Sequence, residues 1–437
     1  MRFLHTSDWH LGRSFHRVNL LDAQREFLDH LIATAGSERV DAVLVAGDVY
    51  DRAVPPLAAV ELFDQTLHRL AELGVPTVMI SGNHDSARRL GVGAGLMGRA
   101  GIHLRTDPAT CHRPVVLADE HGDVAVYGLP YLEPALAHEA FAADEFADDE
   151  PAGEERAAGE RAPDASAAHG PAGGEDTAGA AAADSPPARA RDGRPRADHA
   201  YVLGAAMDRV RADLATRPAG TRSVVLAHAF VTGGTPSDSE RDITVGGVAS
   251  VPAALFDGVD YVALGHLHGC QTISDRVRYS GSPLAYSFSE EHHRKSMWLV
   301  TLGADGGVAA ERLDTPVPRP LARLRGTLDD LLGDPALDRH TGSWIEATLT
   351  DPFRPYEPMA ALAKRFPHIL SLAFDPADAG VGRTATYAQR LRGRGDREIA
   401  EDFVAHVRGS AADDRERAVL QRAFDAVRGE AARTEAR

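Results

Sequence analysis

Residues 3–13 of the chain read FLHTSDWHLGR. This stretch begins with a short apolar run, and Asp8-x-His10 follows the run. Four later apolar runs also end in Asp, Asn or His, and short runs of this kind, rich in Val and Ile, are typical of buried strands. The seven side chains after these five runs that can bind a metal are Asp8, His10, Asp48, Asn83, His228, His266 and His268. Because ligand sites in layered α/β folds gather at the carboxyl ends of strands, we expect the seven to meet at one edge.

The types of these side chains indicate a pair of metal ions. Two divalent ions about 3.5–4 Å apart that act on one phosphate need a bridging carboxylate, with imidazoles and a carbonyl oxygen on either side. Asp48 follows the Gly47 turn and is the candidate bridge, and Asn83 offers a carbonyl oxygen. His84 can stay off the metals and act on the substrate. A solitary His such as His228 is more often structural, so it is the ordered set that favours phosphoester chemistry.

The composition is ordinary for a globular protein of two or three domains, with 437 residues, 43% hydrophobic and 25% charged. The two cysteines, Cys111 and Cys270, are far apart and imply no disulfide framework, which suits a reducing compartment. The first residues contain no long apolar segment, and no stretch approaches the roughly 18 apolar residues of a membrane span. We therefore expect a soluble protein of the cytoplasm.

The formal net charge of −17 argues at first against a nucleic-acid partner, because phosphate backbones attract Lys and Arg. About half of that charge comes from residues 144–198, which hold 14 acidic and 6 basic residues, a net −8. Residues 142–198 are dominated by Ala, Gly, Pro and charged residues, which cannot bury enough apolar surface to offset the entropy of ordering. We interpret them as a disordered low-complexity insertion, either without a function or used for docking a protein.

The sequence around this insertion alternates between apolar runs and helical patterns, which predicts an α/β (α+β) fold with two mixed sheets flanked by helices. Helices are expected at 18–35, 55–73 and 201–215, and strands at 259–264, 277–280, 296–302 and 308–313. This first domain, residues 1–315, ends where a stiff proline-rich link begins. We expect residues 316–395 to form a small α+β domain built on a βαβ-like unit. Its elements are strands at 344–350 and 369–374 and a helix at 358–366.

The last segment, residues 396–437, changes character again. Ile399 and Phe403 lie on one face of a first helix, and a second apolar stripe follows a turn at Ser410. Ser410 with Asp413 resembles a capping box in which Asp replaces Glu. Two short amphipathic helices have little core of their own, so we expect them to dock on a partner protein. Docking on the chain's own core is the alternative.

Six stretches of the sequence form a set that carries a family resemblance. They are HTSDWHLGR (5–13), AGDVYDR (46–52), ISGNHDS (80–86), AHAFV (227–231), ALGHLH (263–268) and SGSPLAYSFSEEHHRK (280–295). Together they resemble the calcineurin-like metallophosphoesterases and, within them, the SbcD family of bacterial nucleases. The resemblance covers most of residues 1–315 outside the insertion, and the remainder more loosely. It implies a four-layer sandwich of two mixed sheets flanked by helices, with a small capping domain and a C-terminal helical pair.

The resemblance also implies roles for single residues. One metal ion would bind Asp8, His10, Asp48 and His268, and a second would bind Asp48, Asn83, His228 and His266. The implied ions are two Mn²⁺, with Mg²⁺ as a substitute, and the mixture of hard oxygen and imidazole ligands agrees with Mn²⁺. His84 would orient or protonate the departing oxygen with support from Asp51, although Asp51 could equally cap a turn. Gly269-Cys270 departs from the family, which more often has a proline there.

The function that the resemblance implies is the nuclease subunit of a DNA-end processing complex. Such a subunit is a 3′–5′ double-strand exonuclease and a single-strand or hairpin endonuclease in DNA repair, recombination and replication. The implied partners are DNA, a second copy of the chain, and an SbcC-type ABC ATPase with a coiled coil, bound by residues 396–437 within a heterotetramer. Arginines that could contact DNA phosphates, or could simply be solvated, are Arg319, Arg323, Arg325, Arg383, Arg390, Arg392, Arg394 and Arg397.

Two alternatives stay open from the sequence. One is a phosphoesterase of the same fold that acts on small molecules or phosphoproteins. The other is a non-catalytic scaffold that tethers DNA to the ATPase, with metals that are only structural.

Overall fold

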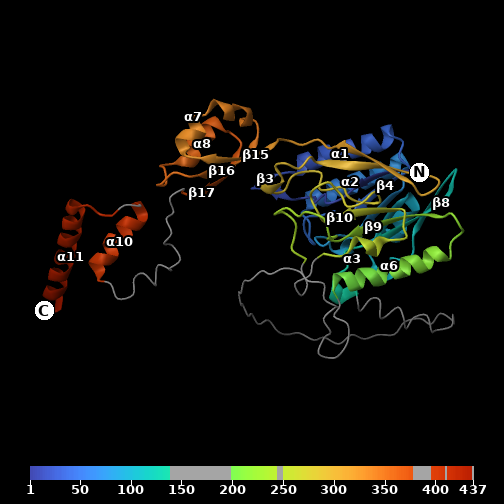
Figure 1. Cartoon of the computed structure of the whole chain (residues 1–437), viewed down its shortest axis with the longest axis horizontal. Coiled ribbons are helices and arrows are strands. Elements are labelled where there is room, and N and C mark those ends of the chain that lie inside the picture. The colour runs from blue at the N-terminus through green and yellow to red at the C-terminus, as the bar shows by residue number, and fades with distance from the viewer. Residues whose placement is uncertain (138–197, 244–249, 377–394, 409–410, 436–437) are drawn as a thin grey trace. The chain divides into compact units, whose positions relative to one another are not determined.

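The computed structural model of the chain describes residues 1–137, 198–243, 250–376, 395–408 and 411–435 (Figure 1). The expected insertion at 142–198 lies, apart from Asp198, outside these residues. The chain divides into two compact units. The first comprises Met1–Arg13, Asn19–Leu284 and Arg294–Pro316, and the second comprises Ser14–Val18, Ala285–His293 and Val317–Arg437.

The first sheet of the first unit has six strands in the order β14-β13-β1-β4-β5-β6. They are β1 (Arg2–Thr6), β4 (Ala42–Ala46), β5 (Thr77–Ile80), β6 (Ile102–Arg105), β13 (Ser296–Leu302) and β14 (Val308–Asp314). β1, β4, β5 and β6 run parallel, whereas β13 pairs antiparallel with both β1 and β14. β4 and β5 are buried throughout, as continuous apolar sequences require of strands covered on both faces.

The second sheet also has six strands, in the order β11-β12-β10-β9-β8-β7. They are β7 (Val115–Asp119), β8 (Gly122–Leu129), β9 (Arg222–His228), β10 (Tyr261–Gly265), β11 (Gln271–Thr272) and β12 (Val277–Tyr279). The four central strands run parallel, and β7 and β11 pair antiparallel with their neighbours at the two edges. Both sheets are therefore mixed, with parallel strands at the centre.

Helices cover the outer face of each sheet. The long helices are α1 (Leu21–Ser37), α2 (Leu57–Leu73) and α6 (His199–Ala215). The shorter turns are α3 (Ala87–Leu90), α4 (Ala94–Met97) and the 3₁₀ segments η1 (Gly98–Ala100), η2 (Pro108–Thr110) and η3 (Ala253–Phe256). One core lies under α1 and α2, a second lies under α6, and a third, which includes Phe3, Leu44 and Leu226, lies between the sheets. This four-layer arrangement confirms the expected sandwich.

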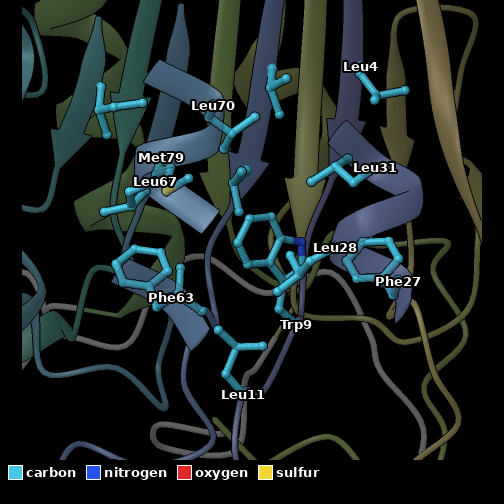
Figure 2. Close-up of a cluster of buried hydrophobic side chains, with 14 of the residues drawn as sticks. Leu4, Trp9, Leu11, Phe27, Leu28, Leu31, Phe63, Leu67, Leu70 and Met79 are labelled. Atoms are coloured by element: carbon cyan, nitrogen blue, oxygen red, sulfur yellow. The ribbon is translucent and has the colours of Figure 1, made fainter. Parts of the chain in front are cut away.

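Trp9 lies inside the core under α1 and α2, one residue after the first candidate ligand. Figure 2 shows its indole among Phe27, Leu28, Leu11 and Phe63, and Trp9 itself has no exposed surface. Its Nε1 donates a hydrogen bond of 3.1 Å to Thr6 Oγ1, so the one polar atom of the ring is satisfied. Each buried side chain of this size stabilises the fold by about 1.5–3 kcal/mol. The loop that carries Asp8 is therefore anchored in the core.

The second unit contains a three-stranded parallel sheet in the order β15-β16-β17. Its elements are β15 (Leu321–Gly326), α7 (Leu328–Gly333), η5 (Pro335–His340), β16 (Trp344–Leu349), α8 (Pro358–Arg365) and β17 (Ile369–Phe374). The expected βαβ-like unit is present, and β15 and α7 extend it. Smaller elements are β2 (Ser14–Phe15), β3 (Val18–Asn19) and η4 (Phe288–Glu290). Phe15 packs at 5.0 Å from Phe288 and at 5.3 Å from Trp344, measured between ring centroids.

Two helices end the chain, α10 (Asp396–Arg408) and α11 (Asp414–Glu435). The capping box at the start of α11 is formed by Asp413 and Glu416, whose side chains each accept the other's backbone N–H at 2.8 Å. The sequence placed this box three residues earlier, and Ser410 lies outside the described residues. No helix within the described ranges combines the length and the apolar character needed to cross a membrane.

Candidate metal centre

The seven candidate ligands come from the carboxyl ends of five parallel strands in two sheets. Asp8 and His10 follow β1, Asp48 follows β4, Asn83 follows β5, His228 ends β9, and His266 and His268 follow β10. Donor atoms within 4.8 Å of one another form three groups: Asp8, His10 and His268; His10, Asp48 and His84; and Asp8, Asp48 and His228. Asn83 joins these groups through its contact with His228, and His266 joins them through its contact with Asn83. The structure thus brings all seven side chains together.

The backbone at this edge is held in an unfavourable conformation. Four of the eight non-glycine residues with positive φ among the described residues are candidate ligands: Asp8 (53°), His10 (46°), Asp48 (51°) and His266 (104°). Such conformations cost about 1–3 kcal/mol each and persist where the surrounding structure fixes them. Here the Asp8 N–H donates to the Gly47 carbonyl at 3.0 Å and the His10 N–H donates to the Asp48 carbonyl at 2.9 Å.

Glycines are required where the strand ends approach each other most closely. A Cβ added to Gly82 would lie 2.1 Å from Asp48 Oδ1, and a Cβ added to Gly265 would lie 2.0 Å from the Ala46 carbonyl oxygen. Real Cβ atoms do not come so close to other atoms, because carbon contacts are optimal at about 3.5–4.0 Å. Gly82 therefore lets the loops after β4 and β5 of the first sheet approach each other, and Gly265 lets β10 of the second sheet approach β4.

Around the first candidate ion position, the side chains of two histidines and two aspartates converge. His10 Nε2 lies 3.1 Å from His268 Nε2 and 3.6 Å from Asp48 Oδ2. The Asp8 carboxylate accepts the backbone N–H of His266 at 3.0 Å and the hydroxyl of Ser7. These contacts fix the orientation of the carboxylate.

Around the second candidate ion position, hydrogen-bond acceptors of His228, Asn83 and His266 face one another. The Ala46 carbonyl lies 2.9 Å from His228 Nδ1 and can only accept, so this nitrogen carries the proton of the neutral ring. The bare Nε2 of His228 then faces Asn83 Oδ1 at 2.9 Å and Asp48 Oδ2 at 3.5 Å. His266 Nδ1 lies 3.2 Å from the same Asn83 oxygen. Only a cation, either a proton or a metal ion, can bring these acceptors together favourably.

The orientation of the Asn83 amide suits a cation at this position, either the proton of His228 or a metal ion. Its Nδ2 is buried and has no hydrogen-bond partner in the described part of the chain. The orientation with Oδ1 toward the two rings suits an oxygen ligand of a cation. The residues present therefore fit a pair of divalent ions.

Burial and mutual charge shift the titration of the site. Burial raises the pKa of Asp8 to about 6, against the lowering effect of nearby imidazoles. Burial also opposes ionisation of Asp48, but His228 beside it brings the pKa of Asp48 well below its usual range. The pKa of His228 is lowered by burial and raised more strongly by Asp48, to about 9. Burial lowers the pKa of His266 to about 3. In the metal-free site at neutral pH, His228 thus carries a second proton, on Nε2, and a metal ion bound there must displace this proton.

His84 and Asp51, the two expected catalytic residues, are also neighbours. His84 Nδ1 lies 2.9 Å from the backbone carbonyl of Asp51, and the His84 N–H donates to Asp48 Oδ1 at 2.8 Å. Asp51 therefore contacts His84 through its carbonyl oxygen, whereas its carboxylate lies 3.6 Å from Arg13 Nε and 3.4 Å from Arg52 Nε. Cys270 belongs to none of the ligand groups among the described residues, and burial raises the pKa of its thiol.

The sequence did not single out Ser239 and Glu240, which position His268. Ser239 Oγ lies 2.6 Å from His268 Nδ1, and Glu240 Oε1 accepts the His268 backbone N–H at 2.7 Å. A partner on Nδ1 fixes the ring so that Nε2 faces the site, which is the usual arrangement behind a metal-binding histidine. Both residues lie in a polar loop without apolar periodicity, so no sequence pattern marks them.

Asp85 is a further residue without an assigned role in the sequence, although it lies inside the third motif. Its carboxylate accepts the backbone N–H groups of Gly82 at 2.9 Å, Val49 at 3.0 Å and Tyr50 at 2.8 Å. It therefore ties the loop after β5 to the loop after β4. The sequence of the motif gave no sign that Asn83 and Asp85 would have such different roles.

Two sequence families match the chain. Residues 1–176 match the calcineurin-like phosphoesterase family, and residues 317–408 match the type 5 capsule protein repressor C-terminal domain, the SbcD C-terminal family. Together with the four-layer fold and the cluster of metal-competent side chains, the first match identifies a calcineurin-like phosphoesterase domain in this chain. The second match, after the proline-rich link, identifies a C-terminal domain of the SbcD type, and the pair of domains supports an SbcD-type protein.

Solved structures give a weaker comparison. The crystal structure of TT1561 of Thermus thermophilus has 12% identical residues and a TM-score of 0.35, and the match covers 71% of this chain and 98% of that chain. A second crystal structure has 12% identity, the same coverage and a TM-score of 0.33. The assignment rests on the two family matches.

Proposed function

We propose that the chain is the nuclease subunit of an SbcCD-type complex, a two-metal phosphodiesterase that acts on DNA. The observation that supports this proposal is the cluster of seven donor side chains with Asp48 among them, in a chain whose C-terminal part matches the SbcD family. In the proposal one ion binds Asp8, His10, Asp48 and His268, and the other binds Asp48, Asn83, His228 and His266. Oxygen and imidazole ligands in this mixture favour Mn²⁺, with Mg²⁺ as a substitute.

When bound, the two ions supply positive charge for the scissile phosphate and lower the pKa of water at the site. The chain's own residues supply the proton transfer and the positioning. In the proposal His84 is the group that moves a proton. Its Nδ1–H is held by the Asp51 carbonyl, so Nε2 can carry a proton to the departing oxygen. Asp51 keeps the imidazole in this orientation and is a positioning residue.

The support for DNA as the substrate is the match of residues 317–408 to the SbcD C-terminal family. The arginines in the described residues add little support. Arg323 forms an ion pair with Glu346 at 3.0 Å, and Arg325 forms one with Asp375 at 2.7 Å, on the exposed face of the small sheet. Both guanidinium groups are thereby partly neutralised. Of the second arginine cluster, Arg383, Arg390, Arg392 and Arg394 lie outside the described residues, and Arg397 forms an ion pair with Glu401 at 3.4 Å. We assign residues 1–315 to phosphodiester hydrolysis and residues 316–395 to capping and DNA contact.

For the ATPase partner, the support is an exposed apolar surface on the last two helices. Phe403 of α10 is 54% exposed and Val419 of α11 is 49% exposed in the isolated chain. We propose that these helices bind the coiled coil of an SbcC-type ATPase. Phe403→Glu should abolish co-purification with that ATPase, whereas Tyr356→Ala, a change at an exposed tyrosine outside the helices, should not. Retained binding by Phe403→Glu would refute the docking proposal.

For a homodimer, the support is an apolar surface on α2 and the turns after β5. Leu57, Val92 and Leu96 are 72%, 69% and 72% exposed, beside an apolar groove of about 320 Å³. Exposed apolar clusters of this kind commonly mark protein interfaces. We propose a second copy of the chain as the occupant. Leu96→Glu should convert a dimer into a monomer in light scattering, and a monomeric wild-type protein would contradict the proposal.

The experiment that tests the nuclease function uses the full chain, with and without its ATPase. End-labelled duplex, single-stranded and hairpin DNA are incubated with Mn²⁺, and wild type is compared with His84→Ala. We expect 3′–5′ shortening of duplex ends and opening of hairpins by wild type, and loss of both in the variant by roughly 10²–10⁴-fold. His121→Ala, at an exposed histidine of the β7–β8 turn, is the control. Absence of metal-dependent DNA cleavage by wild type would refute the proposal.

A further inference from the structure

A cavity of about 460 Å³ lies beside the metal centre in the first unit. Asn83 forms part of its wall, and the Oδ1 atom of the same residue faces His228 Nε2 at 2.9 Å and His266 Nδ1 at 3.2 Å. The cavity and the centre therefore share a wall. A volume between about 300 and 1,000 Å³ is that of small-molecule sites, so the cavity can hold a nucleoside but not a duplex.

The cavity contains a rigid aromatic surface, Tyr131. Its backbone N–H donates to the Ser81 carbonyl at 2.8 Å and its hydroxyl donates to Glu133 Oε2 at 3.1 Å. Its ring meets the His228 imidazole edge-on at 6.4 Å and the His199 imidazole at 5.8 Å, between centroids. A half-buried tyrosine fixed at both ends offers a stacking surface that loses little entropy on binding.

The charges of the wall distinguish a base from a phosphate as occupant. Glu133 and Asp242 both line the cavity, and their carboxylates repel a phosphate while they can accept hydrogen bonds from base N–H groups. Arg241 also lines it, and its Nη1 lies 3.4 Å from the Asn83 carbonyl, on the side of the metal centre. A nucleotide with its base inside and its phosphate toward Arg241 and the centre matches this distribution.

We propose that the cavity binds the base of a nucleotide next to the scissile phosphate, taken out of the base stack and placed against Tyr131. This inference rests on the proposed phosphodiesterase function and specifies its substrate. Removing a base from the stack is least costly in single strands, at frayed ends and in hairpin loops. The cavity therefore selects DNA in which a base can leave its neighbours, and Tyr131 is the residue that determines this selection.

The test measures cleavage of hairpin DNAs in which one abasic position is moved step by step past the cleaved bond. The full chain is used with Mn²⁺, and kcat/KM is determined for each substrate. In wild type, one abasic position next to the cleaved bond should lower kcat/KM by about 5- to 150-fold, the effect of one base–aromatic stack. Tyr131→Phe should keep this dependence on the base. Tyr131→Ala should cleave the intact and the abasic substrate at the same rate.

Tyr201→Ala, at an exposed tyrosine of α6 outside the cavity, is the matched control and should keep the wild-type ratio. The scan with wild type tests the cavity without any substitution, so a misfolded Tyr131→Ala would not remove the test. If the kcat/KM of wild type is the same for every abasic position, the cavity assignment is wrong and the nuclease function still stands. If kcat/KM of Tyr131→Ala still depends on the abasic position as it does in wild type, the cavity assignment is also wrong. Absence of any DNA cleavage by wild type would overturn both.

Discussion

Gly82→Ala gives a sharp test of how the site is held together. The new Cβ would lie 2.1 Å from Asp48 Oδ1 and 2.4 Å from the Asp48 backbone nitrogen. An ordinary contact needs about 3.5 Å, so the Asp48 carboxylate must move by about 1 Å or more. The backbone of Gly82 itself has no positive φ, so the effect is purely steric. Overpacking of this kind costs about 1–3 kcal/mol, and a 1 Å misplacement of reacting groups costs roughly 100-fold in rate.

The assay is titration calorimetry with Mn²⁺, together with phosphodiester cleavage. We expect Gly82→Ala to lose about 10- to 100-fold in Mn²⁺ affinity and roughly 100-fold in rate. Gly204→Ala, in α6, is the matched control, because its Cβ would make only an ordinary contact of 3.7 Å to Leu255 of η3. There alanine should raise stability by about 1 kcal/mol through helix propensity. Wild-type Mn²⁺ affinity in Gly82→Ala would refute the role given to this close approach.

Three further predictions concern the same loops. Because the pKa of His228 is raised to about 9 in the metal-free protein, Mn²⁺ affinity should fall as the pH drops below 9. Calorimetry in two buffers at pH 7 should show the release of about one proton for each protein molecule that binds Mn²⁺. Equal affinity at pH 6 and 9 would contradict this. Ser239→Ala, which removes the contact to His268, should weaken Mn²⁺ binding by about 10-fold or more, and unchanged binding would exclude a positioning role. Trp9→Ala should lower the free energy of unfolding by about 3–5 kcal/mol in denaturant titration, and a loss below 1 kcal/mol would show that the loop is not anchored there.

The sandwich could be predicted from the sequence because its central strands are continuous apolar runs with a polar residue at each carboxyl end. The expected strand at 296–302 and the end of α2 at Leu73 coincide with the structure. The expected strand at 308–313 is the edge strand β14, but several strands, among them β7, the inner strand β8 and β15, were not predicted. β7 alternates buried and exposed residues over a short length, and β15 alternates arginines with buried Ala322 and Leu324, so the charged positions hid the strand.

The convergence of the seven candidate ligands could be predicted from the order of the motifs, but the residues that support them could not. Asp85 and Glu240 act by accepting backbone N–H groups from segments that are remote in sequence. A carboxylate in a loop has the same sequence pattern whether it accepts such bonds or is solvated. The contact of His84 with the carbonyl of Asp51 is equally invisible, because every residue has a carbonyl. Only the folded backbone distinguishes these cases.

The sharing of Asp48 by two metal ions is tested most directly by diffraction from crystals grown with Mn²⁺, with data collected at the manganese absorption edge. Two anomalous peaks about 3.5–4 Å apart are expected, both bonded to the Asp48 carboxylate, with His228 and Asn83 on one and His10 and His268 on the other. A single peak, or two peaks of which only one contacts Asp48, would contradict the proposed centre.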